Sequence, residues 1–397
     1  MKYLVSFMLS AGMWLAASTA EAAKPDVIIP FEQANGAIFI QVVVAGRPLW
    51  FIFDTGDKYA VIDLPVARLL GLDLGPPIPV GGAGAATVTG NLVQRGDVQV
   101  AGLDGFSQPL FIALPMDTIS RAEGREVAGL LGQDFIRQFV VDIDYRRHTL
   151  TLHDKAGFVY TGHGQALDIA FGPSGLPQAH ARIVDATGHA VDGAFTIDTG
   201  STGALILNTP FVAQNYLLQQ GQATLPLRGG AGVGGDLQGQ VGRVAALELA
   251  GFTVDKPYAV FAEATSGVFA ASDVAGNIGS QILQTFKVTL DDDHGRIYLE
   301  PNDGFAAPLD YDMSGITLAA SGPGFRTFTL SVVTPNTPGA AGGLAAGDRL
   351  TAIDGRPATT YSLSDLRALF SHPGKVSLTV ERAGAQRTVS LDLRPLI

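Results

Sequence analysis

The sequence Phe53-Asp54-Thr55-Gly56 recurs further along the chain as Ile197-Asp198-Thr199-Gly200, at an offset of 144 residues (198 minus 54). Other landmarks keep the same order at similar offsets: residues 60–62 and 204–206 (144), 81–84 and 229–232 (148), 98–103 and 247–252 (149), and 129–132 and 276–279 (147). A repeat of this length changes how each single motif is interpreted. The sequence therefore predicts two homologous units, each with one Asp-Thr-Gly segment.

Within each unit, short apolar runs alternate with turn residues, a pattern typical of β strands. Residues 38–44 and 49–53 flank a turn and lead into Asp54, and residues 179–184 and 194–197 do the same for Asp198. A short helix is expected after Pro65 and after Pro210, because proline suits the first helical turn. Each unit should close on a hairpin, at residues 139–143 with 149–152 and at residues 286–290 with 296–299.

Two aspartates in matched settings suggest acid–base chemistry. Amide hydrolysis needs one group that takes a proton from water and another that gives a proton to the carbonyl oxygen. Two carboxylates held close together cannot both ionise easily, so they share one proton and can fill both roles. Asp54 and Asp198 are therefore the candidate catalytic residues, and this chemistry requires no metal and no cofactor.

Each Asp-Thr-Gly segment is followed by a glycine that ends a mostly apolar triplet, Gly132 in the first unit and Gly279 in the second. Together these motifs resemble the pepsin and retropepsin superfamily of aspartic proteases, over about residues 25–302. The resemblance implies a mainly β, bilobed acid-protease fold with two homologous β lobes in one chain, so that a dimer is not required for the active site. It implies an endopeptidase that cleaves polypeptide substrates.

The same resemblance assigns roles to further residues. The threonine hydroxyls would brace the crossing of the two catalytic loops, and the glycines would allow a tight turn and let backbone amides approach the carboxylates. Gly132 and Gly279 would pack behind the loops. The supporting residues implied for the loops themselves are Thr55, Gly56, Thr199, Gly200 and Ser201.

The chain departs from the family pattern at several positions. Asp57 stands where Ser, Thr or Ala is common, and a third acid beside the pair is expected to shift the acid limb of the rate profile to higher pH. Asn277 begins the second triplet, where we expect it mainly to affect packing. Glycine-rich residues 81–90 and 229–240 correspond to substrate-covering loops, but residues 80–95 lack the tyrosine that pepsin-like flaps carry.

Alternative interpretations stay open at this point. The lobes could bind peptides without cleaving them, which would make the chain a catalytically silent periplasmic peptide-binding or scaffold protein. The glycine-rich stretches could cradle a phosphate, although neither contains GxxxxGK[ST]. Residues 291–295 (DDDHG) could hold a metal, although Asp and Gly are also expected in a hairpin turn.

A different pattern begins after Pro301. Residues 343–355 read Gly-Leu-x-x-Gly-Asp-x-Leu-x-x-Ile-Asp-Gly and, with the strand-like residues 328–333, resemble a bacterial PDZ domain. The resemblance implies a helix at residues 362–370, strands at 376–381 and 388–393, and a groove that takes a C-terminal peptide by β-augmentation. The residues expected at the mouth of that groove are Gly315, Ile316, Thr317 and Leu318. A module that only packs against the lobes is the alternative.

Composition and the N-terminal residues indicate an exported protein. The formal charge is -11 and the chain has no cluster of Lys and Arg, which argues against nucleic acid as a partner. Lys2, the apolar residues 3–17 and Ala20-Glu21-Ala22 have the layout of a cleavable signal peptide. A membrane anchor is the alternative, but the apolar run is shorter than the ~20 residues that a span needs. We expect a periplasmic or secreted protein without a stable transmembrane anchor.

The predicted organisation follows from these boundaries: a signal peptide at residues 1–23, an N-terminal protease lobe at 24–160, a C-terminal protease lobe at 161–305 and a PDZ-like α/β module at 310–397. Cysteine is absent from the sequence, so neither a disulfide nor a thiol nucleophile contributes.

Overall fold

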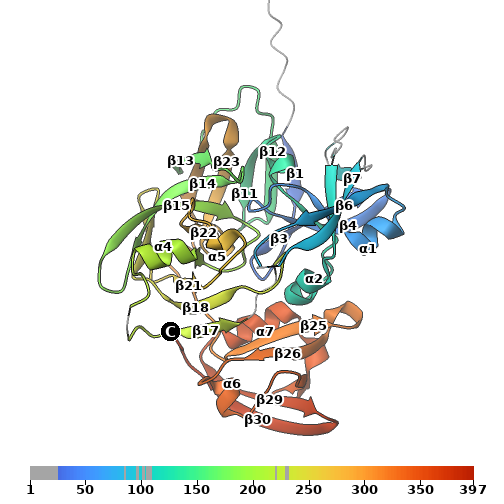
Figure 1. Cartoon of the computed structure of the whole chain (residues 1–397), viewed down its shortest axis with the longest axis vertical. Helices are drawn as coiled ribbons and strands as arrows, with labels where there is room; N and C mark the ends of the chain where they lie inside the picture. The colour runs from blue at the N-terminus through green and yellow to red at the C-terminus, as the bar shows by residue number, and fades with distance from the viewer. Residues whose placement is uncertain are drawn as a thin grey trace, which may run out of the picture.

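The computed structural model describes residues 26–84, 86–94, 98–100, 103, 110–219, 221–228 and 232–397. Strands make up 46% of the structure and helices 14%, which confirms the mainly β fold. The chain runs from the blue to blue-green strands of the first unit, through the green, yellow and gold strands of the second, to an orange and red C-terminal module (Figure 1). The predicted signal peptide lies outside the described residues.

In the first unit, a hairpin delivers Asp54. Strand β3 (Ala37–Val44) returns as β4 (Arg47–Phe53), which buries Phe51 and Phe53 and ends immediately before the aspartate. Strand β10 (Gly129–Leu131) pairs in parallel with β4 and antiparallel with β5 (Val61–Asp63). The sheet continues through β9 (Leu110–Leu114), β7 (Val88–Gln94) and β6 (Leu74–Val80), and β2 (Glu32–Ala34) and β8 (Val98–Val100) pair with β3.

The second unit repeats this arrangement. Strand β14 (Pro177–Val184) returns as β15 (Ala190–Asp198), and β22 (Gly276–Gly279) pairs in parallel with β15 and antiparallel with β16 (Leu205–Leu207). The predicted hairpins before both aspartates are thus confirmed. The sheet is completed by β17 (Leu225–Arg228), β18 (Gln238–Arg243), β19 (Ala246–Leu249), β20 (Phe252–Asp255) and β21 (Tyr258–Ala262).

Strands from both units join the two halves. The predicted closing hairpins are confirmed as β11 (Val140–Asp144) with β12 (Thr149–His153) and β23 (Phe286–Asp291) with β24 (Arg296–Pro301). Strand β11 pairs antiparallel with β23, and β1 (Val27–Pro30) and β13 (Gln165–Phe171) extend the resulting sheet on either side. The two units therefore share backbone hydrogen bonds as well as a hydrophobic core.

The helices of the two units are short. The predicted ones, α1 (Leu64–Leu69) and α4 (Thr209–Gln214), carry proline in the first turn as expected. Three others were not predicted from the sequence: α2 (Asp117–Glu123), α3 (Gln133–Ile136) and α5 (Ser280–Leu283). Helices α3 and α5 begin directly after Gly132 and Gly279, so each unit places one helix behind its Asp-Thr-Gly loop.

The C-terminal module has a sheet and a hydrophobic core of its own. Its strands follow the order β25 (Ile316–Ser321), β26 (Thr327–Val333), β27 (Arg349–Ile353), β29 (Gly374–Arg382) and β30 (Ala385–Leu393), with β28 (Arg356–Pro357) beside β27. Helix α6 (Pro338–Ala341) is short, and α7 (Leu363–Phe370) confirms the predicted helix, with Ser362 and Asp365 forming a reciprocal cap. Along the described parts of the chain, no helix is both long enough and apolar enough to cross a membrane.

Candidate active site

The two Asp-Thr-Gly loops are locked together by reciprocal hydrogen bonds. Thr55 N donates to Thr199 Oγ1 (3.0 Å), and Thr199 N donates to Thr55 Oγ1 (2.9 Å). The hydroxyls continue the pattern, because Thr55 Oγ1 donates to Ile197 O (2.7 Å) and Thr199 Oγ1 donates to Phe53 O (2.9 Å). Both threonines are buried. Four hydrogen bonds in a site closed to water hold the loops in one fixed geometry.

This arrangement brings the carboxylates of Asp54 and Asp198 into contact, and they hydrogen-bond to each other. Each lies over the glycine of the opposite loop. A Cβ atom added to Gly56 would stand 2.3 Å from Asp198 Cγ, and one added to Gly200 would stand 2.2 Å from Asp54 Oδ2. Backbone amides anchor both groups, since Gly56 N donates to Asp54 Oδ1 (2.8 Å) and Gly200 N donates to Asp198 Oδ1 (3.0 Å).

The role of the two glycines differs in part from the sequence-based interpretation. Neither Gly56 nor Gly200 has a positive φ, so the turn itself does not demand glycine. Glycine is required at these positions because the carboxylate of the opposite loop fills the space that a side chain would need. The amide contacts expected at both glycines are present.

Burial and mutual repulsion disfavour two charges at this site. Burial raises the pKa of Asp54 well above its ordinary value, and the negative charges of Asp198 and Asp57 raise it further. Burial also raises the pKa of Asp198, but hydrogen bonds from Ser201 N and the Asn277 side chain oppose that rise. One proton shared by the pair is the physical consequence.

The two carboxylates are not equivalent. Asp198 accepts Gly200 N and Ser201 N (2.9 Å) at Oδ1 and Asn277 Nδ2 at Oδ2 (2.5 Å). Among the described residues, the backbone amide that donates to Asp54 is that of Gly56. Donors stabilise the ionised form of a carboxylate. The negative charge of the pair is therefore favoured on Asp198, and the proton on Asp54.

Asn277 corrects the sequence-based interpretation, which assigned it to packing behind the loop. It lies on β22 opposite Thr196 of β15, and its amide reaches the carboxylate two residues further along that strand. Leu130 occupies the matching position of the first unit, on β10. A comparison of the two repeats could have indicated a special role for Asn277, because its amide stands where the first unit has an apolar residue.

A second layer supports the loops from behind. Gln133 Nε2 donates to Thr55 O (2.9 Å), and Gln133 N donates to Asp57 O (2.9 Å). In the second unit Ser280 N donates to Ser201 O (2.8 Å). A Cβ atom on Gly132 would meet Asp57 O at 2.7 Å, and one on Gly279 would meet Gly203 O at 2.4 Å. Both glycines therefore pack against loop backbone, and Gln133 is a support that the sequence analysis did not identify.

Asp57 lies beside the pair rather than in it. Its Oδ1 accepts the amide of Tyr59 (3.3 Å). Burial raises the pKa of Asp57 to about 6, and the charges of Asp198 and Asp134 act in the same direction. Its own charge raises the pKa of Asp54. Asp57 is therefore a third acid that is electrostatically linked to the pair.

The two glycine-rich loops touch each other, as far as they are described. Gly84 N donates to Val233 O (2.9 Å) and Ala86 N donates to Gly234 O (2.9 Å). The first loop joins β6 to β7, and the second joins β17 to β18. Residues 85 and 229–231 of these predicted substrate-covering stretches lie outside the described residues.

The remaining candidates lie away from the aspartate pair. Gly315 precedes β25, and Ile316, Thr317 and Leu318 are its first residues. Residues 291–295 form the turn between β23 and β24, where Asp291 accepts the amide of His294 (3.3 Å). Over the described residues, no group of three or more His, Cys, Asp or Glu side chains has an arrangement that could hold a metal ion.

Comparisons with known proteins identify two segments of the chain that match family models. Residues 40–135 match the family model described as "Aspartyl protease", and residues 329–382 match the model described as "PDZ domain". None of the curated proteins matches the chain. One similar solved structure is a "photosystem II D1 C-terminal processing protease", at 23% identity and a TM-score of 0.19, over 21% of this chain and 23% of that one. The chain therefore contains a domain of the aspartyl protease family, followed by a C-terminal PDZ domain.

Proposed function

We propose that the chain is an aspartic endopeptidase that hydrolyses extended polypeptides with Asp54 and Asp198 as its catalytic pair. One observation carries the proposal: two interlocked Asp-Thr-Gly loops hold two buried carboxylates in contact, so that together they share one proton. This is the arrangement that amide hydrolysis needs when a single site must supply both a base and an acid. The aspartyl protease match at residues 40–135, which includes Asp54, supports it.

The unequal donors assign a role to each carboxylate. Ionised Asp198, stabilised by Ser201 N and Asn277, is the general base that takes a proton from the attacking water. Asp54 keeps the shared proton and donates it to the carbonyl oxygen, which yields a neutral gem-diol. The proton on Asp198 then passes to the amide nitrogen, a gem-diol proton returns to Asp54, and the C–N bond breaks. The pair ends in its starting state.

The substrate and the setting of the reaction are part of the proposal. Peptide is the substrate class that the protease and PDZ matches favour. One chain suffices, because both aspartates and both supporting glycines belong to it. The signal-like residues 1–23 favour action in the periplasm or outside the cell.

Cleavage mapping by mass spectrometry tests the activity. A peptide library is incubated with the wild-type protein and, in parallel, with Asp198→Asn. Cuts that appear with the wild type and vanish with the variant are the expected result. A wild-type protein that binds library peptides without cutting them at any pH between 3 and 8 would favour the silent peptide-binding alternative.

Asn277→Leu tests the assignment of the base. The change installs the residue that the first unit has at this position, and it removes the 2.5 Å hydrogen bond to Asp198 Oδ2. The pKa of Asp198 then rises, so the acid limb of the kcat/KM profile moves to higher pH. On that limb we expect about a tenfold loss, the effect of one hydrogen bond to a charged group. Asn91→Leu, which removes an amide that donates to Gly75 O (2.8 Å), is the control. An acid limb that stays in place would mean that Asn277 does not tune the base.

Asp57→Asn tests the influence of the third acid, and the structure changes the expectation from the sequence. Because burial raises the pKa of Asp57 to about 6, this residue carries its charge mainly above that pH, so we expect its effect on the basic limb of the profile. Above it, the charge raises the pKa of Asp54. Loss of the charge should therefore move the basic limb to lower pH and leave the acid limb unchanged. The pH dependence of kcat/KM on one peptide measures both limbs, and a shift of the acid limb alone would contradict the assignment.

A further inference from the structure

The predicted peptide groove of the C-terminal module runs along strand β25, whose first residues are those expected at its mouth. Strand β25 ends the sheet of the module, and among the described strands it pairs only with β26, so its other edge carries no strand. A PDZ ligand normally adds to such an edge, with its carboxylate held by the backbone amides at the start of the strand. Met313 N donates to Phe370 O (2.8 Å), which places the C-terminal end of α7 beside this mouth.

The amides at the mouth already hold a carboxylate of the same chain. Gly315 N donates to Asp312 Oδ2 (2.5 Å), and Ser314 Oγ donates to Oδ1 (2.6 Å). Ile316 N in turn donates to Ser314 Oγ (3.0 Å). Asp312 therefore already uses the Gly315 amide, at the mouth where the carboxylate of a bound peptide would be held.

A strand of the second protease unit covers the same mouth. Residues Leu225, Pro226 and Leu227 of β17 line a cavity of about 50 Å³ together with Asp312 and the first residues of β25. Such a cavity has room for a few water molecules at most. Strand β17 therefore narrows the space in which the last residue of a peptide would bind.

The other end of the groove is filled by helix α2 of the first protease unit. Helix α2 lies directly against β25, and in Figure 1 it stands immediately above α7 and β25. Arg367 Nη2, from α7, donates to Ala122 O (2.6 Å). A Cβ atom on Gly124 would stand 2.5 Å from Leu363 Cβ, so the residue that ends α2 touches the start of α7.

From these contacts we propose that the PDZ groove is an interaction surface whose resident partner is the chain itself. Asp312 and β17 occupy the carboxylate-binding end of the groove, and the end of α2 occupies the rest of it. A peptide with a free C-terminal carboxylate and an apolar last residue is then a competitor, which binds only by displacing them. This inference concerns binding and does not depend on the proposed hydrolysis.

The contact between α2 and α7 includes buried polar atoms that favour its opening. In the described part of the chain, Glu123 Oε2 and Arg367 Nη1 are buried without a hydrogen-bond partner. Burial raises the pKa of Glu123 to about 7, although the charges of Arg367 and Arg125 and a hydrogen bond with Asn35 oppose the rise. Buried polar atoms without partners weaken an interface, because their lost hydration is not replaced. The α2–α7 interface is thus formed, but its unpaired buried polar atoms make it less stable than a fully hydrogen-bonded one.

Displacement of α2 would also act on the aspartate pair. After Gly124 the chain passes into β10 and then to Gln133, whose Nε2 supports Thr55 O (2.9 Å). Strand β17 leads into the glycine-rich loop that contacts Gly84. Both segments that occupy the groove are therefore continuous with parts of the candidate active site.

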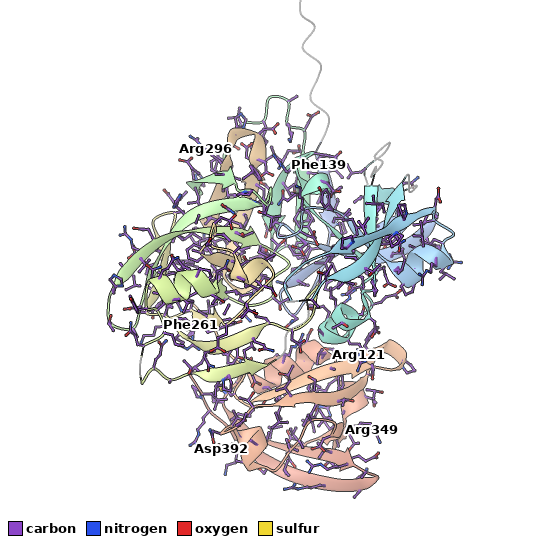
Figure 2. The ribbon with its side chains drawn as sticks, viewed as in Figure 1. Arg121, Phe139, Phe261, Arg296, Arg349 and Asp392 are labelled. Carbon is purple, nitrogen blue, oxygen red and sulfur yellow. The ribbon has the colours of Figure 1, made fainter. Side chains whose placement is uncertain are left out.

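Peptide binding by the full chain tests the proposal. The Asp198→Asn protein is used so that peptide cleavage does not affect the measured anisotropy. Fluorescein-labelled decapeptides ending in leucine or valine are titrated by anisotropy, with the same peptides carrying an amidated C-terminus for comparison. Arg367→Ala removes the hydrogen bond to Ala122 and should bind the free-acid peptides about tenfold more tightly. The matched control is Arg349→Ala, which removes an arginine paired with Glu381 on a part of the module away from α2 (Figure 2).

Hydrogen exchange of α2 gives a second reading that needs no groove variant. Saturating free-acid peptide should speed amide exchange in residues 117–124 and leave the α4 segment unchanged. The proposal is overturned if peptide binds while the amides of α2 remain as protected from exchange as before. It is also overturned if Arg367→Ala binds the peptides no more tightly than the protein that keeps Arg367. It is overturned as well if neither protein binds any free-acid peptide, because the proposal requires that such a peptide can displace Asp312, β17 and α2.

Discussion

We expect kcat/KM to fall more than about 10³-fold in each of three variants: Asp54→Asn, Asp198→Asn and the double variant. The activity of the double variant should equal that of the less active single variant. The reason is geometric. The two carboxylates are in contact, and in the proposed mechanism they share one proton, so neither can act as acid or base without the other. Removal of either one ends the same step. Kinetics on one peptide substrate, with circular dichroism to establish folding, measure the effect.

The control for this prediction lies on the strand that delivers the second aspartate. Asp192 belongs to β15, is exposed and pairs with Arg182 (2.9 Å). Asp192→Asn should keep near-normal turnover. Losses that add in the double variant would show two independent sites, and a single variant with near-normal turnover would exclude the shared proton.

Gly200→Ala is expected to reduce kcat/KM by about 10²-fold or more, although it adds one methyl group and removes no polar atom. The new Cβ atom would stand 2.2 Å from Asp54 Oδ2, so the carboxylate must leave its position. A displacement of about 1 Å at a reacting group costs on the order of 10²-fold in rate. The same substitution at Gly203, where the nearest atom would be Tyr258 Oη at 3.7 Å, provides the matched control.

Two results would contradict this prediction. Normal turnover in Gly200→Ala would mean that the carboxylates do not need their observed separation. An equal loss in Gly203→Ala would mean that the loop, rather than the space above Gly200, is the sensitive feature. Gly56→Ala should resemble Gly200→Ala, because its Cβ atom would meet Asp198 in the same way.

The repeat in the sequence predicted the parts of the fold that local patterns control. Apolar runs with turn residues between them located β3 with β4, β14 with β15 and the two closing hairpins, because a strand pair joined by a short turn is a local structure. Pro65 and Pro210 located α1 and α4 for the same reason. Helix α2 escaped prediction: its seven residues are too few for a periodic pattern, and its N-cap has no side-chain hydrogen bond.

Contacts between distant segments could not be predicted in this way. The resemblance to aspartic proteases implied that Thr55 and Thr199 meet where the two loops cross. It did not indicate that Gln133 supports Thr55 or that α2 packs against β25, since these contacts depend on how whole sheets are placed. Asn277 is an intermediate case: its identity marks it as unusual, but only the parallel pairing of β15 with β22 shows that its amide reaches Asp198.

The interlocked threonines also have a consequence for the newly made protein. Thr55 leaves the ribosome first. The Thr199 hydroxyl and the Ile197 carbonyl that it binds follow 144 and 142 residues later, which at about 5–20 residues per second is a delay on the order of ten seconds. During that interval the nascent chain carries one aspartate without its partner. Under the proposed function, the nascent chain therefore holds only half of its catalytic pair until the second unit has been made and has folded onto the first.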